Sequence, residues 1–143
     1  DIFTREKIVV PYRTKENAFA YNDVEWFCRS DAYVITPKKK NTDLFYLLGL
    51  LNARLNFIWL YNRGKRKGEI LELFQVPLSE IPIIRMERAA EDRISELAKK
   101  ITLIKNKSKS VDTSDLETEI DLILYQAYGL TEAEIELATT AIE

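Results

Sequence analysis

The sequence predicts an α+β fold, in which a small mixed α/β domain built around one long buried helix precedes an antiparallel helical hairpin and a short third helix. Three observations lead to this prediction. Short β-rich segments fill residues 6–37, a leucine-rich stretch covers residues 44–61, and two apolar seams with helical spacing follow. The 143 residues are 46% hydrophobic and 31% charged, which is enough for a folded core. We expect two domains, residues 1–86 and 87–143.

Four short strands are predicted in the first domain. Residues 7–12 are rich in β-branched side chains, and Pro11 indicates an edge strand or a strand end. Further β-rich segments occur at residues 18–21, 26–28 and 32–36. We expect the aromatic side chains of this domain to be core residues more often than base-stacking platforms: Tyr12, Phe19, Tyr21, Trp26, Phe27, Tyr33 and Trp59.

The next predicted element is one helix over residues 44–61. Leucine and isoleucine recur at three- and four-residue steps, and Asn-Thr-Asp at residues 41–43 offers an N-cap. The stretch is apolar on most sides, so a transmembrane span is the rival interpretation. Arg54 lies within it, and an arginine at a bilayer centre costs about 2.5–3.5 kcal/mol. We therefore expect a buried helix and no membrane contact.

Glycines and prolines mark the region after this helix. The segment Gly-Lys-Arg-Lys-Gly at residues 64–68 is predicted to end the helix in a basic loop. Residues 70–84 contain Pro77 and Pro82, which argue against a regular helix or a central strand. An irregular apolar segment is therefore expected there.

The second domain is predicted to be helical. From Glu87 onward, apolar residues keep a four-three spacing for two heptads, until a polar run at residues 106–110 interrupts the pattern. A second seam follows over residues 116–127. The two seams are similar in length, so an antiparallel hairpin is expected.

Capping signals delimit these helices. Ser114 with Glu117 has the spacing of a capping box, and Thr131 with Glu134 repeats it before a short third helix. Gly129 stands where a C-terminal cap belongs.

The sequence lacks most of the chemistry that enzymes use. Histidine is absent and Cys28 is the single cysteine, which excludes Ser-His-Asp and Cys-His catalysis, zinc sites based on these residues and an internal disulfide. The four glycines form no phosphate-binding loop. The acids at residues 112–121 lack calcium-loop spacing and suit helix N-termini. We expect no catalytic residue, metal or cofactor here. The chain begins at Asp1 and reads as a piece of a longer protein.

Charge is distributed unevenly along the chain. Residues 1–109 hold all 21 Lys and Arg against 14 Asp and Glu, a net charge of +7, whereas residues 110–143 hold nine acids and no base. A basic body with an acidic end suggests a polyanionic partner for the body. An ordinary solvated surface with an acidic final helix is the alternative.

Basic loops supply the candidate binding residues. Lysines in such loops suit DNA phosphates, whereas arginine forks suit guanine and asparagine suits adenine. We therefore assign the phosphate contacts to Lys38, Lys39, Lys40, Lys65, Arg66 and Lys67. The candidates for reading base edges are Arg13, Asn17, Arg29 and Arg63, and Lys15 lies in the same loop as Asn17. We expect these cationic turns to converge on one surface. Ordinary solvated turns are the alternative.

The order of segments in the first domain resembles that of the TaqI-like C-terminal specificity domain of Type IIG restriction–modification enzymes and related N6-adenine DNA methyltransferases. The basic glycine-flanked loop contributes to the resemblance, and the tail over residues 125–134 is similar to the C-terminal end of such proteins. The other segments that carry it are Lys7–Arg13, Phe19–Asp23, Ser30–Ile35, Tyr46–Leu55 and Ile81–Ile83.

The resemblance implies a DNA target-recognition domain over residues 1–86 and a helical spacer over residues 87–143. It also implies partners: double-stranded DNA, and an N-terminal methyltransferase part of the same chain, with or without a nuclease. S-adenosylmethionine and magnesium would belong to that missing part, and the protein would be cytoplasmic. The alternatives are a fragment of a Type I specificity subunit, a helical protein-interaction module without DNA binding, and an unrecognised enzyme.

Overall fold

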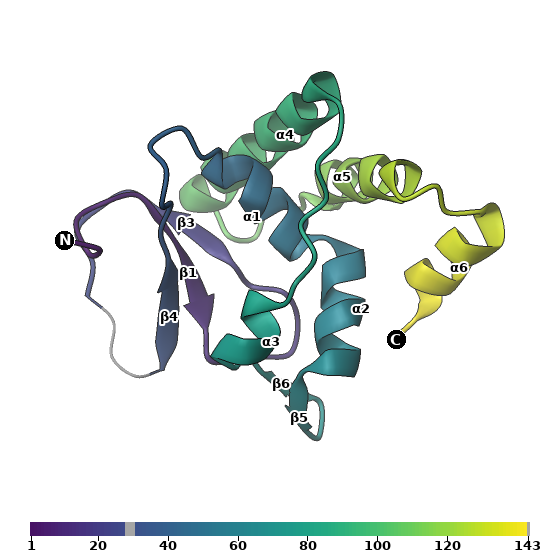
Figure 1. Ribbon diagram of the computed structural model, residues 1–143, viewed down its shortest axis with the longest axis horizontal. Helices are drawn as coiled ribbons and strands as arrows, with labels where there is room; N and C mark the ends of the chain where they lie inside the picture. Colours follow the sequence, from purple (N-terminus) through teal and green to yellow (C-terminus); the bar gives the residue numbers. More distant parts are fainter. Residues whose placement is uncertain (28–30, 143) are drawn as a thin grey trace.

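The computed structural model describes residues 1–27 and 31–142 and has the predicted α+β class (Figure 1). In chain order its elements are β1 (Lys7–Pro11), β2 (Arg13–Thr14), β3 (Ala20–Asn22), β4 (Ala32–Ile35), α1 (Leu44–Asn52), α2 (Arg54–Arg63), β5 (Lys65–Lys67), β6 (Ile70–Glu72), α3 (Gln75–Ser79), α4 (Arg88–Lys107), α5 (Ser114–Ala127) and α6 (Glu132–Thr140).

The strands form two small antiparallel sheets, with strand orders β3-β1-β4 and β2-β6-β5. Tyr12 joins them, because its backbone N–H donates to Asp31 O at 3.0 Å and its carbonyl accepts from the N–H of Leu73 at 2.8 Å. The continuous segment from β1 to β2 therefore contributes one strand to each sheet. Strand β2 pairs with β6, which is distant in sequence, and not with β1 or β3.

Helix α1 is apolar on most sides because it packs against two cores. Leu44, Leu48 and Leu51 face the cluster formed with β1, β3 and β6. Tyr46 and Leu50, on another face, belong to a second cluster with α4 and α5. The helix thus links the part that carries the sheets to the helical hairpin.

The single helix predicted over residues 44–61 is wrong, because the chain breaks at Ala53 into α1 and α2, which are bent by 63°. Asn52 and Asn17 explain the break. The Asn52 amide pairs with the backbone of Phe19, accepting its N–H at 3.0 Å and donating to its carbonyl at 2.9 Å. The Asn17 amide donates to the carbonyls of Leu51 and Ala53 at 2.9 and 3.3 Å. Both partnerships span more than thirty residues, so local sequence does not reveal them.

Two other predicted elements also differ. Residues 26 and 27 are not in a strand, and Phe27 is 63% exposed, which contradicts its expected place in the core; Cys28 lies outside the described residues. The segment expected to be irregular contains β6 and α3. Pro77 fits α3 because it occupies the first turn, where its missing N–H has no helical partner to lose.

The caps of the helices in residues 87–143 are partly as predicted. Helix α5 begins after Thr113, and the capping box expected at Ser114 does not form. Instead, the N–H of Ser114 donates to the carboxylate of Asp112 at 2.9 Å. Gly129 has φ of +67°, and the N–H of Leu130 donates to Tyr125 O at 3.0 Å, as in a Schellman cap. The capping box of Thr131 is confirmed.

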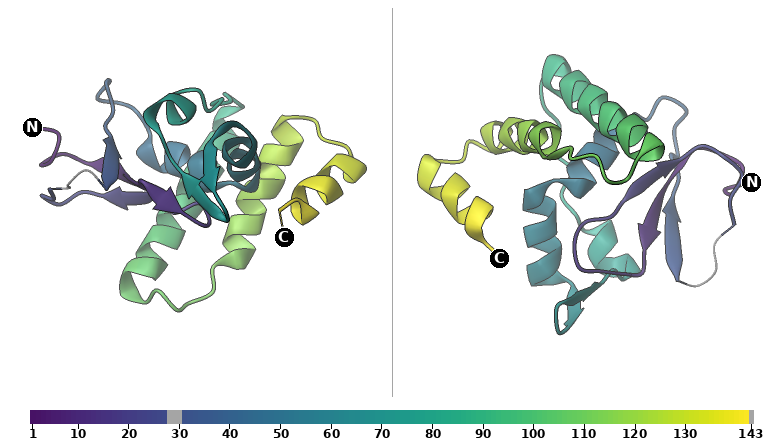
Figure 2. Two further views of the ribbon diagram at one scale, coloured as in Figure 1. Left: turned by 90° about the horizontal axis from the view of Figure 1, so that it is seen from below. Right: turned by 180° about the vertical axis from the view of Figure 1, so that it is seen from behind.

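Helices α4 and α5 form a hairpin, and α6 folds back beside α2 (Figure 2). Within the described residues no single helix has the length and apolar composition to cross a membrane, although the bent pair α1–α2 meets those criteria jointly. The leucines of that pair fill the two cores described above.

Candidate nucleic-acid interface

The sheet β2-β6-β5 gathers basic side chains on one face. In its register Arg13 on β2 and Lys65 on β5 both lie opposite Glu72 on β6. Lys67 is two residues after Lys65 and therefore lies on the same face. Arg13 forms an ion pair with Glu72, with Nη2 and Oε1 3.5 Å apart. Strand pairing thus brings together cations that are about fifty residues apart in sequence.

Two further arginines border this sheet and are held against aromatic rings. The guanidinium carbon of Arg66, on the opposite face of β5, lies 3.9 Å from the ring centroid of Tyr61. That of Arg63 lies 6.0 Å from the ring of Trp59. Such cation–π contacts limit the orientations of a guanidinium while leaving its N–H groups free to bind. We call Arg13, Arg63, Lys65, Arg66 and Lys67 the hairpin cluster.

The basic segment is a β-hairpin strand rather than the predicted loop. Gly64 ends α2 where a side chain would collide, since an added Cβ would lie 2.6 Å from Leu60 O. Gly68 has φ of +65° and begins the two-residue connection between Lys67 and Ile70. A glycine at this position is what a tight hairpin requires. Figure 1 and Figure 2 show this hairpin projecting from the body of the molecule.

The other lysine run, Lys38–Lys40, does not join the hairpin cluster. It lies in the connection from β4 to α1, at the opposite end of the molecule from the β5–β6 hairpin (Figure 1). Lys39 lines a cavity together with Arg85 and Arg88. Arg85 forms an ion pair with Glu91 at 2.9 Å, and Arg88 forms one with an aspartate one helical turn away. The expectation that all cationic turns converge is therefore wrong for this run.

The remaining predicted residues are placed differently from one another. The Asn17 amide is engaged with backbone carbonyls beneath α1, so its donor groups are structural rather than available to a base. Lys15 is exposed in the same connection. Arg29 lies outside the described residues. Sequence reasoning missed Glu72 as a member of the basic face, although an acid two residues after the apolar Ile70 in a strand pattern was the available signal.

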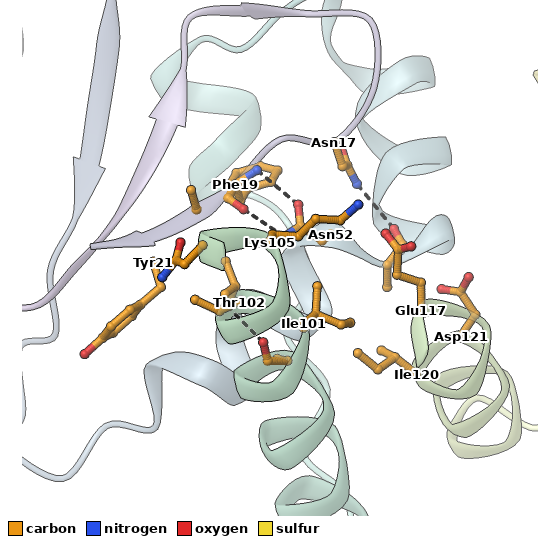
Figure 3. A pocket seen from close by; sticks show the side chains of 16 residues that line it. Asn17, Phe19, Tyr21, Asn52, Ile101, Thr102, Lys105, Glu117, Ile120 and Asp121 are labelled. Carbon is orange, nitrogen blue, oxygen red and sulfur yellow. Dashed lines mark hydrogen bonds between the residues drawn. The ribbon is translucent and has the colours of Figure 1, made fainter. Parts of the chain in front are cut away.

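A cavity of about 250 Å³ lies between the 15–19 connection, α1, α4 and α5 (Figure 3). Its floor is apolar, with Phe19 and Ile120 among its lining residues, and Glu117 and Asp121 lie on its α5 side. Asp121 accepts the N–H of Arg54 at 2.9 Å, and burial raises the pKa of its carboxyl to about 6. The Asp121 carboxylate therefore caps α2 from the neighbouring helix α5. The N-cap residue itself, Ala53, has no side-chain oxygen that could do so.

Nothing in the described ranges, 1–27 and 31–142, offers a metal site: no group of three His, Cys, Asp or Glu side chains comes together. The exposed cations of the hairpin cluster are suited to binding a polyanion.

Comparison with known proteins shows the family to which the first part of the chain is similar. The model of the TaqI-like C-terminal specificity domain matches residues 1–83, a range that contains the whole hairpin cluster. Type II methyltransferase M.HincII of Haemophilus influenzae is 28% identical over 118 residues, covering 74% of this chain and 23% of that protein. Type II methyltransferase M.HindII of the same species is also 28% identical over 118 residues, and the match covers 74% of this chain and 22% of that protein. The chain spans less than a quarter of these curated relatives. It belongs to the family of TaqI-like C-terminal specificity domains.

Proposed function

We propose that this chain is the DNA target-recognition domain of a restriction–modification methyltransferase, and that the hairpin cluster meets the duplex. The observation that carries the proposal is the gathering of Arg13, Lys65 and Lys67 on one face of the antiparallel sheet β2-β6-β5, from which the β5–β6 hairpin projects. The major groove of B-DNA admits a two-stranded β-ribbon. The membership in a specificity-domain family supports the same role.

The cations divide between two tasks in this proposal. Lys65, Arg66 and Lys67 meet phosphates, which fix the register of the protein on the duplex without reading sequence. Arg13 and Arg63 read base edges, because a guanidinium fork can bind guanine O6 and N7 together. Lys38–Lys40, in the connection from β4 to α1 and away from the hairpin, meet phosphates that flank the sequence that is read.

The catalytic steps belong to the rest of the parent protein. We infer that an N-terminal part binds S-adenosylmethionine and methylates adenine at N6, with the helical hairpin α4–α5 orienting the recognition domain against it. Any magnesium-dependent cleavage also falls to that part. The relatives named Type II methyltransferases favour this assignment over a Type I specificity subunit.

A salt series on the full-length parent tests the binding role. Lys67→Ala should weaken binding to all duplex sequences alike and lower the slope of log K against log salt by about one unit. Lys107→Ala, an exposed lysine at the end of α4, is the matched control and should leave the slope unchanged. If Lys67→Ala changes neither affinity nor slope, the hairpin does not meet DNA.

A further inference from the structure

Glu72 stands at the centre of the basic face, in the middle strand of its sheet. Its side chain is 8% exposed, and it lies opposite Arg13 on one side and Lys65 on the other. The chain thus places a nearly buried carboxylate among cations to which we assign DNA contacts. A negative charge there weakens the attraction for phosphates and costs desolvation, so affinity alone does not explain it.

The surroundings of Glu72 are ordered on both sides. The guanidinium carbon of Arg13 lies 5.6 Å from the ring centroid of Tyr12, and the ammonium of Lys65 lies 5.5 Å from that of Phe74. The two rings pack edge to face, with centroids 5.4 Å apart. Each cation therefore lies near an aromatic ring and opposite the carboxylate in the strand register.

We infer that Glu72 is a positioning residue that determines DNA sequence preference by fixing the guanidinium fork of Arg13. This inference rests on the proposed function. The side chain of Glu72 is too buried to reach a base itself, whereas that of Arg13 is 58% exposed and can. A guanidinium reads a base pair only when its fork is aligned with two acceptors, so an orienting carboxylate changes selectivity more than affinity.

The test uses the full-length parent and a library of duplexes with randomised sequence. Glu72→Gln keeps the shape of the side chain and removes its charge, and it should lower the preference at one base-pair position by roughly 5- to 150-fold. Affinity for non-specific DNA should stay equal or rise, because a negative charge has gone. Glu69→Gln, an exposed acid in the hairpin connection, makes the same charge change and should leave the preference intact.

Two further variants separate positioning from folding. Arg13→Lys keeps the charge but loses the fork, so it should lower the preference at the same base-pair position. In an Arg13→Gln background, Glu72→Gln should cause no additional loss of preference. An effect at a different position, an unchanged preference, or an equal loss for all sequences would overturn the inference while leaving DNA binding intact. If the wild-type parent selects no sequence at all, the proposed function fails and the inference falls with it.

Discussion

Single buried polar residues determine much of this structure, and Lys7 is the extreme case. Its side chain is fully buried in β1, and its ammonium donates to the carbonyls of Phe3, Arg5 and Val24 at 2.9, 3.0 and 2.8 Å. All three donors of the ammonium are thereby used. Lys7 thereby attaches the N-terminal segment to the sheet. Because it is buried, it does not contribute to a basic surface, although it is one of the 21 Lys and Arg residues of the sequence.

Asp121 makes the stability of the fold depend on pH. Its carboxyl is buried near Glu117, and burial raises its pKa to about 6, against the influence of the Arg54 N–H and charge. In the unfolded chain the same group titrates near its ordinary value of 3.8. The folded state therefore holds this proton over a pH range in which the unfolded state has released it.

The expected result is a loss of stability with rising pH. The contribution of Asp121 is fully present below about pH 4 and is lost as the pH rises to about 6, by on the order of 2 kcal/mol. Asp121→Asn keeps an oxygen for the Arg54 N–H and cannot ionise. Unfolding free energies are measured by urea titration from pH 4 to pH 7. The value for wild type minus the value for Asp121→Asn should decrease as the pH rises across this range. A constant difference would contradict the raised pKa.

At the scale of elements, the contact of α1 with α4 depends on Gly49. A Cβ at this position would lie 2.6 Å from Cγ2 of Ile94, a fully buried side chain, and 3.6 Å from Cβ of Ala98. The string Leu-Leu-Gly-Leu-Leu-Asn at residues 47–52 thus has a packing role: glycine allows the close approach, and Asn52 bonds to the backbone of Phe19, just before β3. Arg54 adds a tie to α6, since its guanidinium donates to the carbonyls of Ala138 and Ala141.

Gly49→Ala should destabilise the protein despite the better helix propensity of alanine. That propensity favours alanine by about 1 kcal/mol, but overpacking a fixed core contact costs about 1–3 kcal/mol. A net loss in chemical denaturation is expected, with separation of α1 from α4 as its cause. A gain in stability from Gly49→Ala would show that the two helices do not approach this closely.

The elements with strong periodicity were predictable from sequence, and those set by distant partners were not. Helices α4 and α5 follow from their apolar seams, and the cap at Gly129 from local chain geometry. The break at Ala53 was hidden because the hydrogen bonds of Asn17 and Asn52 join the end of α1 to residues 17–19, more than thirty positions away in sequence. The basic hairpin likewise needed β2 as a third strand. The cations of the site could be found by residue type, but the central place of Glu72 required the register.

At the scale of the whole molecule, the two charge regions occupy different parts of the fold. The acidic residues between 112 and 136 lie in or next to α5 and α6, while the hairpin cluster lies on β5, on the neighbouring strand β2 and at the end of α2 (Figure 1). Opposite charges at separate places orient a protein in the field of a polyanion. In the proposed complex the hairpin would approach DNA first, and α5 and α6 would face the rest of the parent protein.

Backbone hydrogen exchange of the full-length parent, with and without duplex DNA, tests the central claim most directly. If the hairpin cluster is the DNA-contacting surface, binding will slow exchange over residues 12–14 and 63–72, where β2, β5 and β6 meet, and will leave the exposed faces of α5 and α6 unchanged. Slowed exchange confined to α5 and α6, with none in the hairpin, would contradict the account.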